Sequence, residues 1–346
     1  MDVKRLKALR RGLDVFVSRF EDYIKTVPSR RHMRTYVAGQ VSDLERKNLA
    51  SIALEAGVPP RSLQEFLAIL RWDERAVGER VQKIVAGEHA DPNATAVIDE
   101  ASFGKKGEKT AGVQRQYCGA SGKIDNCVVT VHLGYVGGDF HALVDSDVYL
   151  PEAWLADRAR CREAGIPDRV VYRPKWRIAL DLLRHTLGNG VHLKYLTADE
   201  EYGRCGAFRA EVDALGLLYV VEVPCALKGW TQRPRVLGPW AGSTGRGRPR
   251  TRPELAAGAP LPRRVDRLWK RGGPSWRSFH VKNTQKGPVV WEARTTRFSP
   301  WPKGGLPGEE LWLVVARNVL DGEVKYFLSN APHAAIARGG CDDCTS

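Results

Sequence analysis

The chain has 346 residues, of which 43% are hydrophobic and 27% are charged, so it is long and apolar enough to bury a sizeable core. This composition excludes wholesale disorder. Lys and Arg together number 54 against 40 Asp and Glu, which gives a formal net charge of +14. An excess of this size makes a polyanion the first expected partner.

The sequence offers no membrane segment and no export signal. No stretch approaches the ~20 consecutive apolar residues of a membrane span, and the first residues alternate charged with apolar side chains, unlike a signal peptide. The seven cysteines are unevenly spaced and odd in number, so they do not form a disulfide ladder. We therefore expect a protein of the reducing cytoplasm with no membrane partner.

Residues 1–92 are expected to form a helical N-terminal region. Apolar residues over 49–56 recur at i, i+3, i+4 and i+7, Ser62 and Glu65 form the capping box of a following helix, and Asp73 can cap a third. Short helices joined by tight turns are compatible with a DNA-binding helix-turn-helix. They describe a plain helical bundle equally well.

From Ala94 the periodicity changes, and residues 93–224 predict an α/β layer architecture. Three strands joined by short turns come first, and helices and strands then alternate, which predicts a mixed sheet with helices packed on it. The expected strands are 94–99, 113–118, 126–135, 192–199 and 217–223, and the expected helices are 151–164, 175–187 and 203–215.

Residues 225–332 form the basic part of the chain. The segment 226–277 contains 13 Lys/Arg and two acids, an excess of 11 out of the net 14 charges, and its run 242–253 is rich in Pro and Gly. One interpretation is a solvated insertion. The other is a mobile arm that contacts DNA phosphates, because cations on a flexible backbone gain affinity from counterion release. The arm's candidate DNA-binding residues are Arg246, Arg248, Arg250 and Arg252.

Two acids occupy equivalent places. Asp99 and Asp199 each end an apolar strand, and each is followed by Glu. A carboxylate at a strand's carboxyl end enters the crevice where α/β folds bind ligands, and two of them can hold a pair of Mg²⁺ ions for phosphodiester chemistry. Such acids also commonly cap the next helix without further role. Lys105 and Lys106, expected next to Asp99, are candidates for contacting DNA phosphate.

Several segments resemble a known family. The segments that carry the resemblance are 97–107, 112–127 with its Arg-Gln-Tyr-Cys-Gly run, 150–154, 198–203 and 326–330. In this order they resemble the bacterial insertion-sequence transposases of the DDE superfamily endonuclease group. The resemblance implies an RNase H-like mixed sheet with an inserted β-rich, basic segment. It also implies that Asp99 and Asp199 are the first two acids of an Asp-Asp-Glu triad.

The same resemblance implies activity, cofactor and partners. Water and then a DNA 3′-hydroxyl attack phosphodiesters at transposon ends, with two Mg²⁺ or Mn²⁺ ions as cofactors. The expected partners are double-stranded DNA, as transposon ends and target, and a second copy of the chain as a homodimer. The protein would then be associated with the nucleoid.

The tail departs from the family. There the third acid is a Glu on a helix soon after the strand that corresponds to 324–328, but residues 333–346 do not resemble that region. Asp342 and Asp343 stand in a glycine-flanked end with no amphipathic helix to direct them. We therefore expect a truncated, inactive transposase copy that lacks the final catalytic helix. The alternatives are a non-catalytic DNA-binding remnant or regulator that competes for transposon ends, and a general Mg²⁺ nuclease.

Overall fold

The computed structural model describes residues 3–70, 72–239, 250–269, 273–284, 287–302 and 305–332. By its contacts the chain divides into two compact units, residues 1–88 and 89–346. Arg246, Arg248 and the tail 333–346, all singled out in the sequence, lie outside the described residues.

The first unit is helical throughout its described part. Its core is an apolar cluster that includes the buried side chains of Phe20, Ile24 and Phe66, with Trp72 stacked on Phe66 at 6.3 Å between ring centroids. The elements are α1 (Val3–Ser18), a short 3-10 turn (Glu21–Tyr23), α2 (Val27–Gln40), α3 (Leu49–Glu55), α4 (Pro60–Ala68) and α5 (Glu74–Glu88).

The helix starts in this unit confirm one expected cap and correct another. Asp73 caps α5, since its Oδ1 accepts the backbone N–H of Ala76 at 2.9 Å. The capping box at Ser62 and Glu65 is wrong: α4 begins at Pro60, so Ser62 lies inside the helix, and Glu65 binds Arg61 at 2.7 Å. Pro59 and Pro60 preset the backbone of the first turn, so the helix starts two residues before Ser62.

The second unit is built on one large mixed sheet. Twelve strands join it in the order β10-β7-β12-β13-β14-β6-β5-β1-β3-β2, with β4 paired to β3 and β11 to β12, while β8 and β9 form a separate pair. Its core strands are β1 (Thr95–Gly104), β2 (Gln114–Cys118), β3 (Lys123–Gly137), β4 (Phe140–Val148), β5 (Tyr195–Ala198) and β6 (Leu218–Glu222). The fold is the expected mixed α/β architecture.

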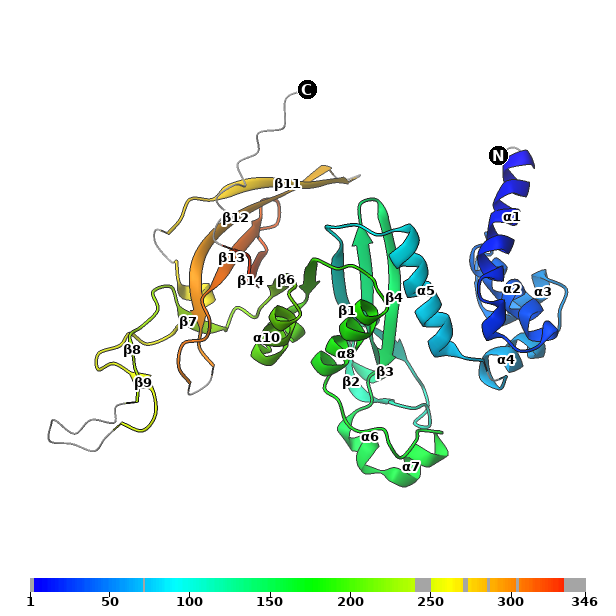
Figure 1. Ribbon diagram of the computed structural model, residues 1–346, viewed down its shortest axis with the longest axis horizontal. Helices are drawn as coiled ribbons and strands as arrows, with labels where there is room; N and C mark the ends of the chain where they lie inside the picture. Colours follow the sequence, from blue (N-terminus) through cyan, green and yellow to red (C-terminus); the bar gives the residue numbers. More distant parts are fainter. Residues whose placement is uncertain are drawn as a thin grey trace. The chain divides into compact units, whose positions relative to one another are not determined.

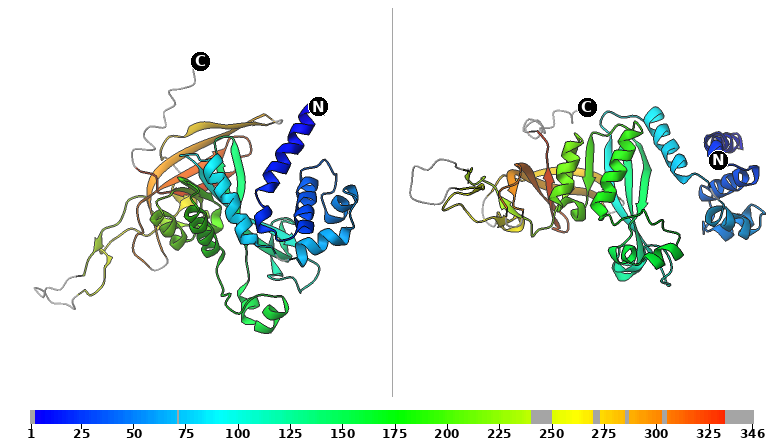
Figure 2. Two further views of the ribbon diagram at one scale, coloured as in Figure 1. Left: turned by 45° about the vertical axis from the view of Figure 1, so that its right-hand side comes forward. Right: turned by 60° about the horizontal axis from the view of Figure 1, so that its bottom comes forward.

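Within this sheet, β1 is antiparallel to β3 and parallel to β5, which is parallel to β6. This is the strand arrangement that the RNase H-like resemblance implies. Side chains alternate between the two faces, and one face carries the fully buried residues Ile98, Leu133 and Val221. The helices α8 (Lys175–Gly188) and α10 (Gly206–Ala214) cover that face together (Figure 2).

The remaining helices of the unit are short. They are α6 (Glu152–Ala156), α7 (Arg158–Glu163) and α9 (Glu200–Gly203). Trp154 fixes α6 to the start of β2: its side chain is buried, and its Nε1 donates to the carbonyl of Val113 at 2.6 Å. Trp154 is the last residue of the segment 150–154, so this contact gives that segment a structural role.

Most strands of the insertion extend the same sheet, while β8 and β9 pair with each other in a separate two-stranded sheet. Its described strands are β7 (Lys228–Trp230), β8 (Val236–Leu237), β9 (Glu254–Leu255), β10 (Arg263–Arg264), β11 (Arg277–Thr284), β12 (Gly287–Pro300) and β13 (Leu311–Asn318), with a 3-10 turn at Val265–Arg267. The long β11–β12 hairpin is visible in Figure 1. Next, β14 (Val324–Ser329) pairs with β13 on one side and with β6 of the core on the other.

A ladder of alternating arginines and tryptophans lies on this extension. The guanidinium of Arg294 lies 4.3 Å from the ring centroid of Trp269 and 4.4 Å from that of Trp276. Arg317 follows on Trp276 at 4.7 Å. Such contacts are worth about 0.5–2 kcal/mol each, so this ladder contributes to the stability of the extension.

No helix in the described part of the chain is long and apolar enough to cross a bilayer.

Candidate active site on the open face of the sheet

Asp99 and Asp199 are brought together by strand register. Ile98 of β1 pairs in parallel with Ala198 of β5, so the residues that follow them, Asp99 and Asp199, come side by side. Neighbouring strands lie about 4.8 Å apart. Since Ile98 and Ala198 face the helices, alternation turns both acids to the opposite, open face, and both residues are exposed.

The two acids are held differently. Asp199 follows the last residue of β5 and caps α9, with its Oδ1 accepting the backbone N–H of Glu201 at 3.0 Å. Asp99 does not end its strand, which corrects the expected strand end: β1 continues to Gly104 because its antiparallel pairing with β3 continues. Only the parallel pairing with β5 stops at Ile98.

This longer strand also corrects the position of Lys105 and Lys106. Both are exposed and lie in the loop after β1, where Asn126 Nδ2 donates to the carbonyl of Lys105 at 2.9 Å. Lys105 is six residues beyond Asp99, about 20 Å along an extended strand. The two lysines are therefore not neighbours of the acids.

The surroundings of the acids are those of a like-charged pair. Partial desolvation of its carboxylate raises the pKa of Asp199, and the charge of Asp99 raises it further, while hydrogen bonds from Glu201 and Tyr202 oppose the shift. Oxygen donors of this kind suit a hard divalent cation such as Mg²⁺ or Mn²⁺, which would relieve the repulsion between them. By donor chemistry, Asp99 and Asp199 fit the cation that the fold implies.

His132 is the cross-strand partner of Asp99. Its Nε2 lies 2.6 Å from Thr130 Oγ1, and its buried Nδ1 has no hydrogen-bond partner. Burial lowers the pKa of His132, although the charge of Asp99 opposes this effect. No cluster of three or more His, Cys, Asp or Glu side chains suited to a metal occurs among the described residues, so His132 does not complete a triad.

The raised pKa of Asp199 gives a testable pH dependence. The folded chain holds this proton more tightly than the unfolded chain, so the metal-free protein should lose stability as the pH rises from the ordinary value of 3.8 through the raised one. Asp199→Asn removes this loss, so its stability relative to wild type should increase with pH across that window and then level off. Urea unfolding in EDTA at closely spaced acidic pH values measures the difference. A difference that stays constant with pH would contradict the shift.

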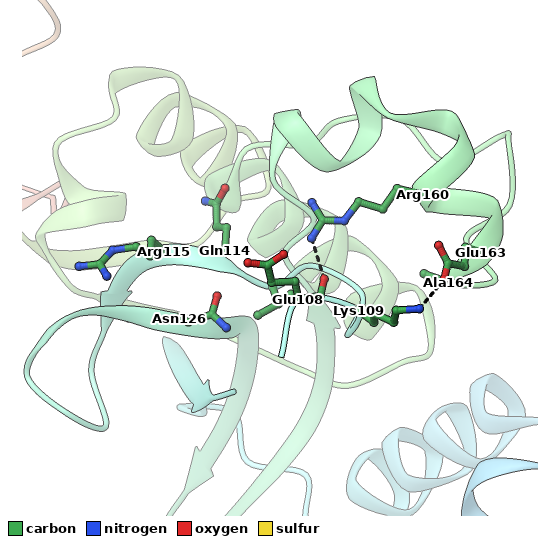
Figure 3. A pocket seen from close by; sticks show the side chains of 9 residues that line it. Glu108, Lys109, Gln114, Arg115, Asn126, Arg160, Glu163 and Ala164 are labelled. Atoms are coloured by element: carbon green, nitrogen blue, oxygen red, sulfur yellow. Dashed lines mark hydrogen bonds and ion pairs between the residues drawn. The ribbon is translucent and has the colours of Figure 1, made fainter. Parts of the chain in front are cut away.

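A polar cavity of about 590 Å³ lies beyond the far end of β1, lined by residues of the β1–β2 loop, β2, β3 and α7. Figure 3 shows its ionic groups contacting one another: Arg160 donates to the carbonyl of Glu108 at 2.7 Å, and Lys109 binds Glu163 at 3.1 Å. Neither Asp99 nor Asp199 lines this cavity. It is therefore a surface feature separate from the candidate active site.

A second basic site, missed in the sequence, lies on the insertion. Arg277 and Arg294 line a cavity of about 460 Å³ together with the half-exposed ring of Phe279. Burial and the nearby charge of Arg317 lower the pKa of Arg294, whose buried Nε has no hydrogen-bond partner. The two arginines are 17 positions apart and meet only through the β11–β12 hairpin, so a linear charge count could not find them.

Of the expected arm, only Arg250 and Arg252 are described. Arg250 is held by Glu254, with Nε 2.5 Å from Oε1, and it also donates to the carbonyl of Gly238. Arg252 is exposed, and within the described ranges it has no such partner.

Comparisons with known proteins give the family of this chain. The profile of the DDE superfamily endonuclease family matches residues 19–288. Over 190 residues the chain is 35% identical to the probable transposase for insertion sequence element IS701 of Microchaete diplosiphon, an alignment that covers 54% of this chain. It covers 46% of that protein, so the chain spans about half the length of this curated relative.

Among solved structures, the Drosophila P element transposase strand transfer complex is similar over 62% of this chain and 43% of that one, with 11% identity and a TM-score of 0.27. The family match alone covers well over half of the chain. The chain therefore belongs to the DDE superfamily endonuclease family.

Proposed function

We propose that this chain is the catalytic part of an insertion-sequence transposase that acts on DNA phosphodiesters at transposon ends. The observation that carries the proposal is the register of β1 and β5, which sets Asp99 beside Asp199 on the open face of the sheet. The family match and the 35% identity to a probable transposase support it.

The proposed reaction has two steps of the same kind. In the first, a water oxygen attacks a phosphorus at the transposon end, the P–O3′ bond breaks, and the 3′ oxygen leaves with a proton. In the second, that 3′-hydroxyl attacks a phosphorus of target DNA and displaces another 3′ oxygen. Divalent cations bound by the acids would stabilise the charge on the attacking and leaving oxygens.

The role proposed for the protein's own groups is to hold this site. Asp99 and Asp199 supply carboxylate oxygens from two rigid strands, and the cap between Asp199 and the amide of Glu201 fixes the second carboxylate. Among the described residues no third carboxylate joins Asp99 and Asp199 in a metal-binding cluster. A cation held by these two carboxylates alone would be loosely bound, and we infer that such a site supports little or no transposition.

Mg²⁺-dependent nicking or joining of transposon-end DNA tests this expectation. Purified chain should leave end-containing duplexes intact over hours, because two carboxylates hold the cations too loosely. Efficient strand transfer that Asp99→Ala abolishes would contradict the expected inactivity, while it would support the assignment of the acids. Equal cleavage of duplexes without transposon ends would instead indicate a general nuclease.

The alternative function is DNA binding without catalysis, as a regulator that competes for transposon ends. It is favoured by one observation: the described residues bring no third carboxylate to the two acids, while the chain carries a formal net charge of +14. Its signature is salt-dependent DNA binding that persists without Mg²⁺ and survives Asp99→Ala.

We also propose that two copies of the chain form a homodimer.

The arm offers a graded test of DNA contact. Arg252→Gln should reduce the slope of log affinity against log salt by about one, because an unpaired guanidinium that binds one phosphate releases about one counterion. Arg250→Gln should have a smaller effect, since Glu254 already neutralises its charge. Fluorescence anisotropy of a labelled duplex over a salt series measures both slopes. Equal slopes in the two variants and wild type would show that this part of the arm does not contact phosphate.

A further inference from the structure

A partly buried ionic cluster lies directly behind the candidate active site, on the other face of β1. Glu100 follows Asp99 and points to the helix-covered side. There its Oε2 accepts the Lys175 Nζ–H at 2.6 Å, and its Oε1 accepts the Tyr202 hydroxyl at 3.1 Å. The Glu100 and Lys175 side chains are 19% and 25% exposed, and Tyr202 is fully buried. Each oxygen of the carboxylate thus accepts a hydrogen bond from a different element.

The two donors belong to the elements that flank the acids. Lys175 is the first residue of α8, and Tyr202 lies in α9, the helix that Asp199 caps. A cation at a helix N-terminus opposes the helix dipole, so the placement of Lys175 is unfavourable for α8 by itself. Its contact with Glu100 offsets that cost and fixes the start of α8 against β1.

The connection to the second acid is short. Tyr202 comes three residues after Asp199, and α9 is one turn long. Glu100 therefore links the strand that bears Asp99 to the helix that bears Asp199, through one hydroxyl hydrogen bond. The parallel pairing of β1 and β5 ends at Ile98 and Ala198, so no backbone ladder joins the strands beyond that point.

We propose that Glu100 is a positioning residue, which with Lys175 and Tyr202 sets the separation of the Asp99 and Asp199 carboxylates for the divalent cation. This inference rests on the proposed function for the cation. It does not make Glu100 a metal ligand, because its carboxylate faces away from the open side of the sheet and is occupied by its two donors.

The test compares Glu100→Gln and Tyr202→Phe with a matched control, Asp181→Asn. Asp181 lies on α8, the helix that begins with Lys175, and its carboxylate binds Arg173 at 2.9 Å, but it contacts neither acid's element. Two readouts are needed: Mn²⁺ affinity by electron paramagnetic resonance, and hydrogen exchange of the Glu201 amide in metal-free protein. That amide is protected through its bond to Asp199 Oδ1.

Glu100→Gln should weaken Mn²⁺ binding about tenfold, as loss of an outer-shell partner does, and should accelerate exchange of the Glu201 amide. Tyr202→Phe removes a single hydroxyl, so it should change Mn²⁺ affinity and amide exchange in the same direction but to a smaller extent. It provides the test if Glu100→Gln does not fold. Asp181→Asn should lower the melting temperature without moving either readout. The proposal is overturned if both test variants match Asp181→Asn in Mn²⁺ affinity and amide exchange.

The two readouts separate this inference from the proposed function. If wild-type protein binds no Mn²⁺ at the acids, the metal assignment fails, while the amide exchange still shows whether Glu100 positions α9. If wild type binds Mn²⁺ and both variants bind it equally well with unchanged exchange, the positioning role alone fails.

Discussion

Asp99→Asn and Asp199→Asn should each lower the affinity of the chain for Mn²⁺ by about 100-fold. Each carboxylate is one of the two that the register of β1 and β5 sets side by side, and an amide is a much weaker donor to a hard cation. Loss of an outer-shell partner already costs 10–100-fold, so loss of a direct ligand should cost at least as much. Titration of Mn²⁺ followed by electron paramagnetic resonance gives the affinities.

Asp139→Asn is the control for this pair. Asp139 is an exposed acid in the turn between β3 and β4, and its strand neighbours pair with the start of β1 rather than with Asp99. The Asp139→Asn substitution removes the same charge and should leave Mn²⁺ affinity within twofold of wild type. Both site variants should stay folded in EDTA, since removing one of two like charges relieves repulsion. Unchanged Mn²⁺ affinity in both would refute the assignment of the acids.

Gly203→Ala should unfold or severely destabilise the second unit, by about 3 kcal/mol or more. An added Cβ at Gly203 would lie 1.8 Å from the backbone carbonyl oxygen of Glu222, so α9 could not keep its place against β6. The offending atom is backbone in the middle of the sheet and cannot move aside. This close approach explains why the segment 198–203 ends in glycine.

Gly206→Ala provides the matched comparison for this substitution. Gly206 is the first residue of α10, and an added Cβ there would meet only the end of the flexible Arg209 side chain, at 3.7 Å. It should change stability by less than about 1 kcal/mol. Urea unfolding curves of both variants measure the difference. A Gly203→Ala protein as stable as Gly206→Ala would show that α9 does not pack on β6 as described.

Much of the core could be predicted because its signals are local. Asp199 was correctly expected at the end of an apolar strand, since its own side chain caps the next helix. The end of β1 was misplaced, because pairing with β3 decides where the strand stops, and no local sequence feature marks it. The strand Phe140–Val148 was missed for a related reason: four of its nine residues are polar or charged, and partnership with β3 stabilises it.

The contacts behind the site could not be read from the sequence at all. Glu100 and Lys175 are separated by 75 positions, and Glu100 and Tyr202 by 102, so only the fold brings them together. The strands of the insertion could not be predicted from the sequence either. Several are two or three residues long, too short to show a period, and pairing with other strands of the insertion stabilises them.

The position of β14 has a consequence for how the protein is made. This strand, Val324–Ser329, lies between β6 and β13 in the middle of the sheet, although it is the last described strand to leave the ribosome. Until then the core ends in the open edge of β6, ready to pair with any available strand. Non-local closure of this kind is slow, so nascent chains should be most prone to aggregation while residues 223–323 are being synthesised.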